Sequence, residues 1–105
     1  MIMSPILEAM TTRIVNNFNP SQIILFGSHA RGDAHKYSDI DLLVVLPVVE
    51  NKRKAAIAIR RILADFPVSK DIIVTTQEEI SKRGNVIGSV LKPALKEGKV
   101  IYEQR

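Results

Sequence analysis

The spacing of hydrophobic and polar residues divides the first part of the chain into a helix and a strand. Over residues 4–18 apolar side chains recur at helical intervals, which predicts one helix. A Ser-Pro pair suits its start, and the Asn-Pro pair that follows suits its end. Residues 22–26 (QIILF) are apolar without a helical period, which predicts a short buried strand that Gly27 ends.

The middle of the chain repeats this alternation. Residues 39–46 (DIDLLVVL) show the strongest strand pattern, and a proline follows them. Residues 50–66 predict an amphipathic helix that ends before the next proline. Its basic side chains, among them Arg60 and Arg61, lie mostly off the apolar face, where we expect them to be solvated. Residues 71–75 (DIIVT) predict a third strand.

The C-terminal part of the chain predicts two further helices and a last strand. Thr76 is a suitable N-cap for a helix over residues 77–83, because Glu79 stands at the capping-box position. Residues 86–97 predict a further helix, interrupted by a glycine. The apolar run at 100–103 (VIYE) predicts a last short strand.

Alternation of helices and strands predicts an α/β or α+β fold, with a small mixed β-sheet and helices packed against it. The chain has 105 residues and an apolar fraction of 46%, so we expect one compact domain over residues 1–105. A cleft between two large lobes cannot be built from so short a chain. If a site needs a second wall, a homodimer or a hetero-complex must supply it.

Net charge narrows the function only a little. Fifteen Lys and Arg against eleven Asp and Glu give a net charge of +4. A basic surface suits phosphates, nucleotides or an acidic partner, but ordinary solubility explains a charge this modest better. No basic stripe interleaved with aromatic residues supports a nucleic-acid platform, so nucleic acid is not an expected partner.

The absence of cysteine excludes disulfides and thiolate metal sites, and it fits a reducing compartment. The N-terminal segment MIMSPILEAM has neither a basic region nor a long apolar run. No stretch of the sequence approaches the length that a membrane span needs. We therefore expect a cytoplasmic protein without a signal peptide and without a partner membrane.

Two carboxylates open the strongest predicted strand. Asp39 and Asp41 flank Ile40, and because side chains alternate across a strand, both carboxylates should point to one face. Adjacent anions on a buried strand repel each other and lose hydration, so a cation is expected to compensate them. Oxygen ligands suit Mg²⁺ or Mn²⁺. A bare DxD pair, however, more often only ends a loop.

A second feature lies at the corner formed by Gly27 and Ser28. Gly27 has no Cβ, so a phosphate can approach the backbone closely. Ser28 would begin a brief helix over residues 28–31 and offer a hydroxyl and a free N–H to an anion. An isolated Gly-Ser pair is more often a plain helix cap. The GxGxxG and GxxxxGK[ST] patterns are absent, so dinucleotide and P-loop interpretations have no support.

Together these two features carry a resemblance. Gly27-Ser28, ten residues and then Asp39-x-Asp41, within GSHARGDAHKYSDIDLLV, resemble the DNA polymerase beta-like nucleotidyltransferase superfamily, in particular its minimal nucleotidyltransferase branch. The likeness covers most of the chain, because the predicted elements follow the family order. It implies that the two aspartates bind Mg²⁺ or Mn²⁺. It also implies that the Gly-Ser corner grips the β and γ phosphates of a nucleoside triphosphate, with ATP as the expected donor.

The resemblance implies roles for two further residues. The family uses a third catalytic carboxylate on a neighbouring strand, and Asp71 matches it at the start of the third predicted strand. Without the resemblance Asp71 would be interpreted as a surface aspartate that leads a strand. Arg31 could neutralise a nucleotide phosphate, or it could equally be a surface arginine at a helix end. Asp33 and Asp65 suit the site less well, since they lie in a predicted loop and at a predicted helix end.

The resemblance also suggests an acceptor. Larger members of the superfamily carry a helical domain that completes the acceptor site, and minimal members are often encoded beside a separate all-helical HEPN protein that resembles a ribonuclease toxin. This implies an antitoxin that moves AMP from ATP to a hydroxyl of that partner. Two other interpretations stay open. One is transfer to a small molecule, such as an aminoglycoside, or to an RNA end. The other is a non-catalytic module that neutralises its partner by binding.

Overall fold

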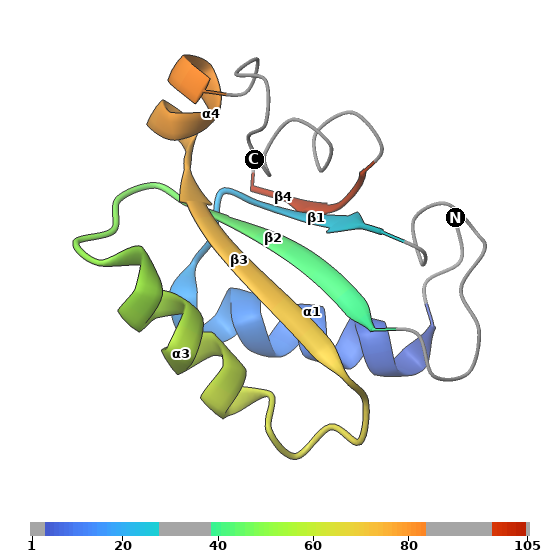
Figure 1. The fold of residues 1–105 in the computed structure, drawn as a ribbon. Coiled ribbons are helices and arrows are strands. Elements are labelled where there is room, and N and C mark those ends of the chain that lie inside the picture. The colour runs from blue at the N-terminus through green and yellow to red at the C-terminus, as the bar shows by residue number, and fades with distance from the viewer. Residues whose placement is uncertain (1–3, 28–38, 84–97, 105) are drawn as a thin grey trace.

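A mixed four-stranded β-sheet with helices packed against it forms the framework of the protein, as the computed structural model shows (Figure 1). The structure describes residues 4–27, 39–83 and 98–104. Within these ranges the strand order is β3-β2-β1-β4. In chain order the elements are α1 (Pro5–Phe18), β1 (Gln22–Phe26), β2 (Ile40–Leu46), α3 (Lys52–Ile62), β3 (Lys70–Thr76), α4 (Gln77–Arg83) and β4 (Lys99–Glu103).

The strand directions divide the sheet into two parts. β1 pairs antiparallel with both β2 and β4, whereas β2 and β3 run parallel. Helix α3 lies between the two parallel strands in the sequence, because a parallel pair needs a crossover connection. The predicted α/β class with a small mixed sheet is therefore confirmed.

Helix α1 begins and ends where neighbouring residues satisfy its backbone groups. The Ser4 hydroxyl accepts a hydrogen bond from the Leu7 N–H at 3.3 Å, and Pro5 takes the first helical position. At the other end Asn19 adopts the left-handed conformation with φ 48°, and its N–H donates to the Val15 carbonyl. Both predicted ends of this helix are confirmed.

Helix α3 is shorter than the predicted range 50–66. The side chain of Asn51 caps its start. At its other end the Arg13 guanidinium, from α1, donates to the Ile62 carbonyl at 2.9 Å. Pro67 also disfavours helical backbone at the residue before it. The predicted end at residue 66 is therefore wrong: after Ile62 the backbone turns through i→i+3 hydrogen bonds, and the Arg13 contact satisfies the last helical carbonyl.

The strands agree with their predicted ranges to within one residue at each end. β1 matches its predicted range, while β3 gains a residue at each end and β4 gains one at its start. β2 begins at Ile40, so Asp39 lies just before the strand rather than in it. Helix α4 matches its predicted range, and the Glu79 N–H donates to the Thr76 hydroxyl at 3.2 Å as the capping box requires.

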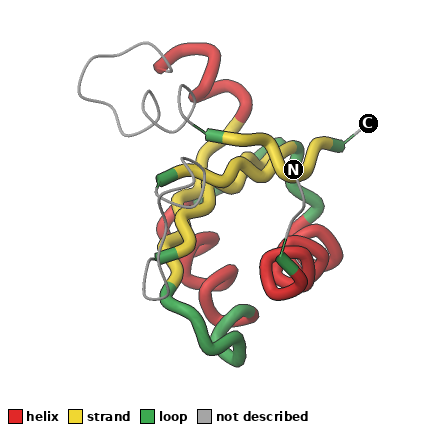
Figure 2. The backbone as a smooth tube through the Cα atoms, turned by 90° about the vertical axis from the view of Figure 1, so that its right-hand side faces the viewer, coloured by secondary structure: helices red, strands yellow, loops and turns green. Residues whose placement is uncertain are grey.

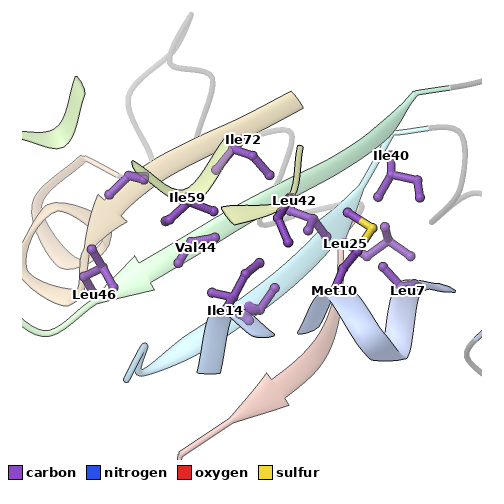
Figure 3. Packing of buried hydrophobic residues seen from close by; sticks show 13 residues of the cluster. Leu7, Met10, Ile14, Leu25, Ile40, Leu42, Val44, Leu46, Ile59 and Ile72 are labelled. Carbon is purple, nitrogen blue, oxygen red and sulfur yellow. The ribbon is translucent and has the colours of Figure 1, made fainter. Parts of the chain in front are cut away.

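One face of the sheet carries the main hydrophobic core. Helices α1 and α3 both cover this face, as the view along the sheet shows (Figure 2). Side chains from both helices meet those of the strands there (Figure 3). The buried members are Leu7, Met10, Ile14, Ile23, Leu25, Ile40, Leu42, Val44, Leu46, Ile59, Leu63, Ile72 and Val74.

The opposite face carries a smaller cluster of Ile24, Leu43 and Val45. Ile80 of α4 packs against this cluster. Side chains of β2 therefore alternate between the two clusters, as a strand buried on both faces requires. The predicted brief helix at 28–31, the polar loop at 33–38 and the helix at 86–97 lie outside the described residues.

Candidate functional site

Gly27 and Asp41 meet where β1 ends and β2 begins. Asp41 is the cross-strand partner of Phe26, and Gly27 follows with φ 73°. A Cβ atom at Gly27 would lie 2.2 Å from Oδ2 of Asp41. No side chain fits in that space, so the Asp41 carboxylate lies directly against the Gly27 backbone. The glycine is required here both by its positive φ and by this close approach.

Asp71 is the neighbour of Asp41 on the parallel side. The register of β2 and β3 makes Asp41 and Asp71 Cα partners. Ile72 belongs to the main core and Ile73 packs against the smaller cluster, so alternation places Asp71 on the face of the smaller cluster. Asp41 lies on the same face, because Ile40 and Leu42 belong to the main core. Adjacent strands are about 4.8 Å apart, so the two aspartates are neighbours across the ladder.

Asp39 is held less firmly than the other two aspartates. It is exposed and precedes the strand, whose ladder begins when the Ile40 N–H donates to the Ser69 carbonyl at 2.9 Å. The expectation that Asp39 shares a buried strand with Asp41 is therefore wrong. Strand alternation does not fix the direction of a side chain outside the ladder. The burial argument applies only to Asp41, which is half-buried.

Arg60, which the sequence pattern predicted to be solvated, contacts this site. Nη2 of Arg60, in the last turn of α3, lies 2.8 Å from Oδ1 of Asp71. Arg60 comes from the helix that covers the main core, whereas Asp71 lies on the other face. The ion pair therefore passes around β3, the outer strand of the described sheet. The helical pattern showed that Arg60 lies off the apolar face, but not that the edge of the sheet is within its reach.

The three aspartates supply the donor chemistry of a magnesium or manganese site. Their ligands are all oxygen, and Asp41 and Asp71 lie on one face in register. In the part of the chain that the structure describes, however, no three His, Cys, Asp or Glu side chains gather closely enough to hold a metal ion. The residues fit such an ion by type, and Asp41 and Asp71 are neighbours, while the Asp71 carboxylate is paired with Arg60.

Two predicted nucleotide-binding residues, Ser28 and Arg31, lie outside the described residues. Asp65, which suited the site less well in the sequence, is confirmed as a residue of another region, because it pairs with Arg13 near the end of α3. The hydrogen bond from Arg13 lowers the pKa of the Asp65 carboxyl below its ordinary value. This pair joins α1 to α3 and has no place in the chemistry.

A hollow lies at the C-terminal ends of β2 and β3, away from the aspartates, and the bonds beside it are structural. It is lined by residues that include Pro47, Lys52 and Glu79. The Glu79 carboxylate pairs with Lys52 and accepts a hydrogen bond from the Thr75 hydroxyl at 2.8 Å. These bonds tie the starts of α3 and α4 together, and none of the predicted site residues lines this hollow.

Comparison with known families decides the class of the protein. Residues 7–101 match the family described as "Nucleotidyltransferase domain". The chain belongs to the nucleotidyltransferase domain family. It is also 37% identical over 81 residues to "Putative protein adenylyltransferase MJ0604" of Methanocaldococcus jannaschii, a match that covers 77% of each chain. The resemblance drawn from Gly27-Ser28 and Asp39-x-Asp41 is thereby confirmed, as is the expectation of a nucleotidyltransferase enzyme.

Solved structures share the fold of this nucleotidyltransferase domain. The crystal structure of "a putative nucleotidyltransferase from Sulfolobus solfataricus" superimposes with a TM-score of 0.65 at 20% identity. The match covers 94% of this chain and 78% of the Sulfolobus chain. A toxin-antitoxin crystal structure with AMP-PNP has a TM-score of 0.55 at 19% identity and covers 93% of this chain and 74% of its own. The predicted nucleotidyltransferase fold is therefore confirmed. Among the described residues, no helix is both long and apolar enough to span a bilayer.

Proposed function

We propose that this nucleotidyltransferase moves AMP from ATP to a hydroxyl of a partner protein, with Mg²⁺ or Mn²⁺ as cofactor, and that the partner is a helical HEPN-type toxin that the transfer neutralises. The observation that carries the proposal is the contact between the Gly27 backbone and the Asp41 carboxylate, with Asp71 next to Asp41 in register. This places two carboxylates that would hold a cation next to the glycine corner at the end of β1.

Known proteins support the two finer parts of the proposal. The relative from Methanocaldococcus jannaschii is named "Putative protein adenylyltransferase MJ0604", which supports a protein as acceptor. A toxin-antitoxin structure of the same fold was solved with AMP-PNP, an analogue of ATP, which supports ATP as donor and a toxin as partner. We extend the proposal to a single domain over residues 1–105 that works in the cytoplasm, where ATP is abundant.

Each residue has a defined task in the proposed reaction. Asp39, Asp41 and Asp71 would hold the divalent ion, which when bound supplies positive charge to the triphosphate and to the transition state. The missing side chain of Gly27 lets the Asp41 carboxylate lie against the backbone, and Ser28 would donate hydrogen bonds to the triphosphate.

Proton transfer and bond exchange complete the reaction. Asp71 would accept the proton of the acceptor hydroxyl. The acceptor oxygen then forms a bond to the α-phosphorus, the bond from that phosphorus to pyrophosphate breaks, and pyrophosphate leaves. Arg31, if it faces the site, would neutralise charge on the phosphates.

The test uses the whole chain together with the helical protein encoded beside it. Both are purified and mixed with Mg²⁺ and ATP labelled either at the α or at the γ phosphate. The proposal expects label on the partner from α-labelled ATP only, with a mass increase of one AMP and loss of toxicity. Label from γ-labelled ATP would indicate phosphorylation, and no label from either would refute protein adenylylation.

A matched pair of variants connects the label to the site. Asp39→Asn with Asp41→Asn should lower the labelling roughly a thousandfold or more, because several kcal/mol of charge stabilisation are lost with the metal. Glu50→Gln, an exposed carboxylate away from these residues, should leave the labelling unchanged. If the aspartate variant still neutralises the toxin fully, binding alone neutralises it and the catalytic proposal fails.

A further inference from the structure

Two cations could pair with the Asp71 carboxylate. One is the Arg60 guanidinium, and the other is the divalent ion of the proposed function. The register neighbour of Asp71 is Asp41, on the same face of the sheet, so two anionic side chains stand side by side. Neighbouring carboxylates repel each other unless a cation compensates them. Arg60 of α3 supplies such a cation, with its Nη2 at 2.8 Å from Oδ1 of Asp71.

The position of Arg60 limits what this cation can do. Its side chain comes from α3, which packs on the main-core face, and reaches Asp71 at the start of β3, the outer strand of the described sheet. While the pair is formed, the described carboxylates do not gather as a group of three. The described site is therefore complete in residue type, and the Arg60–Asp71 pair holds one of its carboxylates.

The Arg60–Asp71 ion pair can be replaced by another cation at little cost. The Arg60 and Asp71 side chains are 54% and 50% exposed, and ion pairs at such positions contribute little to stability because water screens them. A divalent ion coordinated by several carboxylates offers Asp71 a stronger partner. The exchange therefore has a small cost for the fold.

We propose that Arg60 is a positioning residue that stands in for the divalent ion: it pairs with Asp71 while the site is empty and gives this carboxylate up when the ion binds. The inference rests on the proposed function, because it takes Asp71 as a ligand of that ion. Removing Arg60 should consequently favour ion binding, whereas a purely structural ion pair would leave ion binding unchanged.

The experiment measures Mn²⁺ binding directly, by electron paramagnetic resonance of the free ion, with no nucleotide and no partner present. Arg60→Gln should bind Mn²⁺ up to about fivefold more tightly than the original protein, the range set by an exposed ion pair. Its melting temperature should be lower without Mn²⁺ and should rise more when Mn²⁺ is added. Arg60→Lys, which keeps a cation at this position, should bind Mn²⁺ more like the original protein.

Two controls separate the ion pair from general charge effects. Arg61→Gln removes the same charge from the next position of α3, and Arg61 is exposed with no carboxylate partner among the described residues. The gain should also vanish when Arg60→Gln is made in an Asp71→Asn background, because the two residues act as one unit. Equal Mn²⁺ affinity of Arg60→Gln and Arg61→Gln, or weaker binding by Arg60→Gln, would overturn the proposal.

The outcomes also separate this inference from the proposed function. Tighter Mn²⁺ binding by Arg60→Gln without any labelled partner would keep the role of Arg60 and remove protein adenylylation. A labelled partner with unchanged Mn²⁺ affinity would keep the proposed function and remove the role of Arg60. If neither the original protein nor Arg60→Gln binds Mn²⁺, the inference is wrong together with the metal site.

Discussion

Strand β2 presents two surfaces that differ in what holds them. On the face covered by α1 and α3, Ile40, Leu42 and Val44 pack into the main core and are almost completely buried. On the other face the strand begins with Asp41, which is half-buried against Gly27 and next to Asp71. Further along this face Leu43 and Val45 are buried in the smaller cluster, so within the strand the candidate chemistry falls to Asp41 alone. Changes on the two faces should accordingly have separable effects.

The largest expected loss of stability comes from the core face. Leu42→Ala should lower the free energy of unfolding by about 2–5 kcal/mol, because it removes a side chain with 0% exposure and leaves a cavity between the sheet and its helices. Denaturant unfolding measures this loss. Val48→Ala, at a position 83% exposed, is the matched control and should change stability by no more than about 0.5 kcal/mol. Similar losses in both variants would contradict the burial of this face.

Gly27→Ala tests the contact between the two regions. The variant should lose about 1–3 kcal/mol of stability, because alanine is strained at φ 73° and its Cβ would collide with the Asp41 carboxylate. Nucleotidyl transfer should fall as well, since Asp41 must move away. In an Asp41→Ala background the same change should cost less, because only the backbone strain remains. An equal cost in both backgrounds, measured by denaturant unfolding, would show that the collision contributes nothing.

The smallest effect is expected away from both faces, at the junction of α1 and α3. Arg13 lies over the Phe66 ring at 4.5 Å and donates to the Ile62 carbonyl. Arg13→Ala should lower the free energy of unfolding by about 1 kcal/mol, the usual size of such partly exposed contacts. Nucleotidyl transfer should be unchanged, because Arg13 contacts none of the site residues in the described structure. A loss of transfer at full stability would contradict the separation of this junction from the site.

The pH dependence of the Arg13 variant sharpens that prediction. The hydrogen bond from Arg13 lowers the pKa of Asp65 in the folded protein below its ordinary value of 3.8. A lowered folded pKa means that the contribution of this pair is present above pH 3.8 and is lost as the pH falls through the folded value. The stability difference between the original protein and Arg13→Ala should therefore shrink in acid, and unfolding curves recorded at falling pH measure it.

Local patterns predicted the elements well and their ends less well. The strand periods of β1 and β2 and the caps of α1 and α4 depend on residues close in sequence, so the pattern of the chain contains them. The end of α3 was predicted wrongly because the apolar period continues into the i→i+3 turns after Ile62, where Arg13, far away in the sequence, satisfies the last helical carbonyl. The start of β2 was predicted at Asp39 instead of Ile40, because the alternation of side chains does not show where backbone pairing with the neighbouring strands begins.

For the site, the sequence by itself indicated the family and the candidate residues. The spacing of Gly27-Ser28 and Asp39-x-Asp41 was sufficient to indicate the family that the comparisons confirmed. This was possible because the motif consists of two short segments, each of which is recognised from residues adjacent in the sequence. The roles of Ser28, Arg31 and the three aspartates remain predictions that the proposed variants test.

Only the tertiary structure decided how these residues stand toward one another. Strand pairing brings Asp41 against Gly27 and beside Asp71, and the packing of α3 brings Arg60 around the edge of β3 to Asp71. Neither arrangement follows from spacing, because the register of two strands and the reach of a helix side chain depend on how distant segments pack. The sequence indicates the carboxylates, and the packing of α3 beside β3 brings the Arg60 guanidinium to one of them, Asp71.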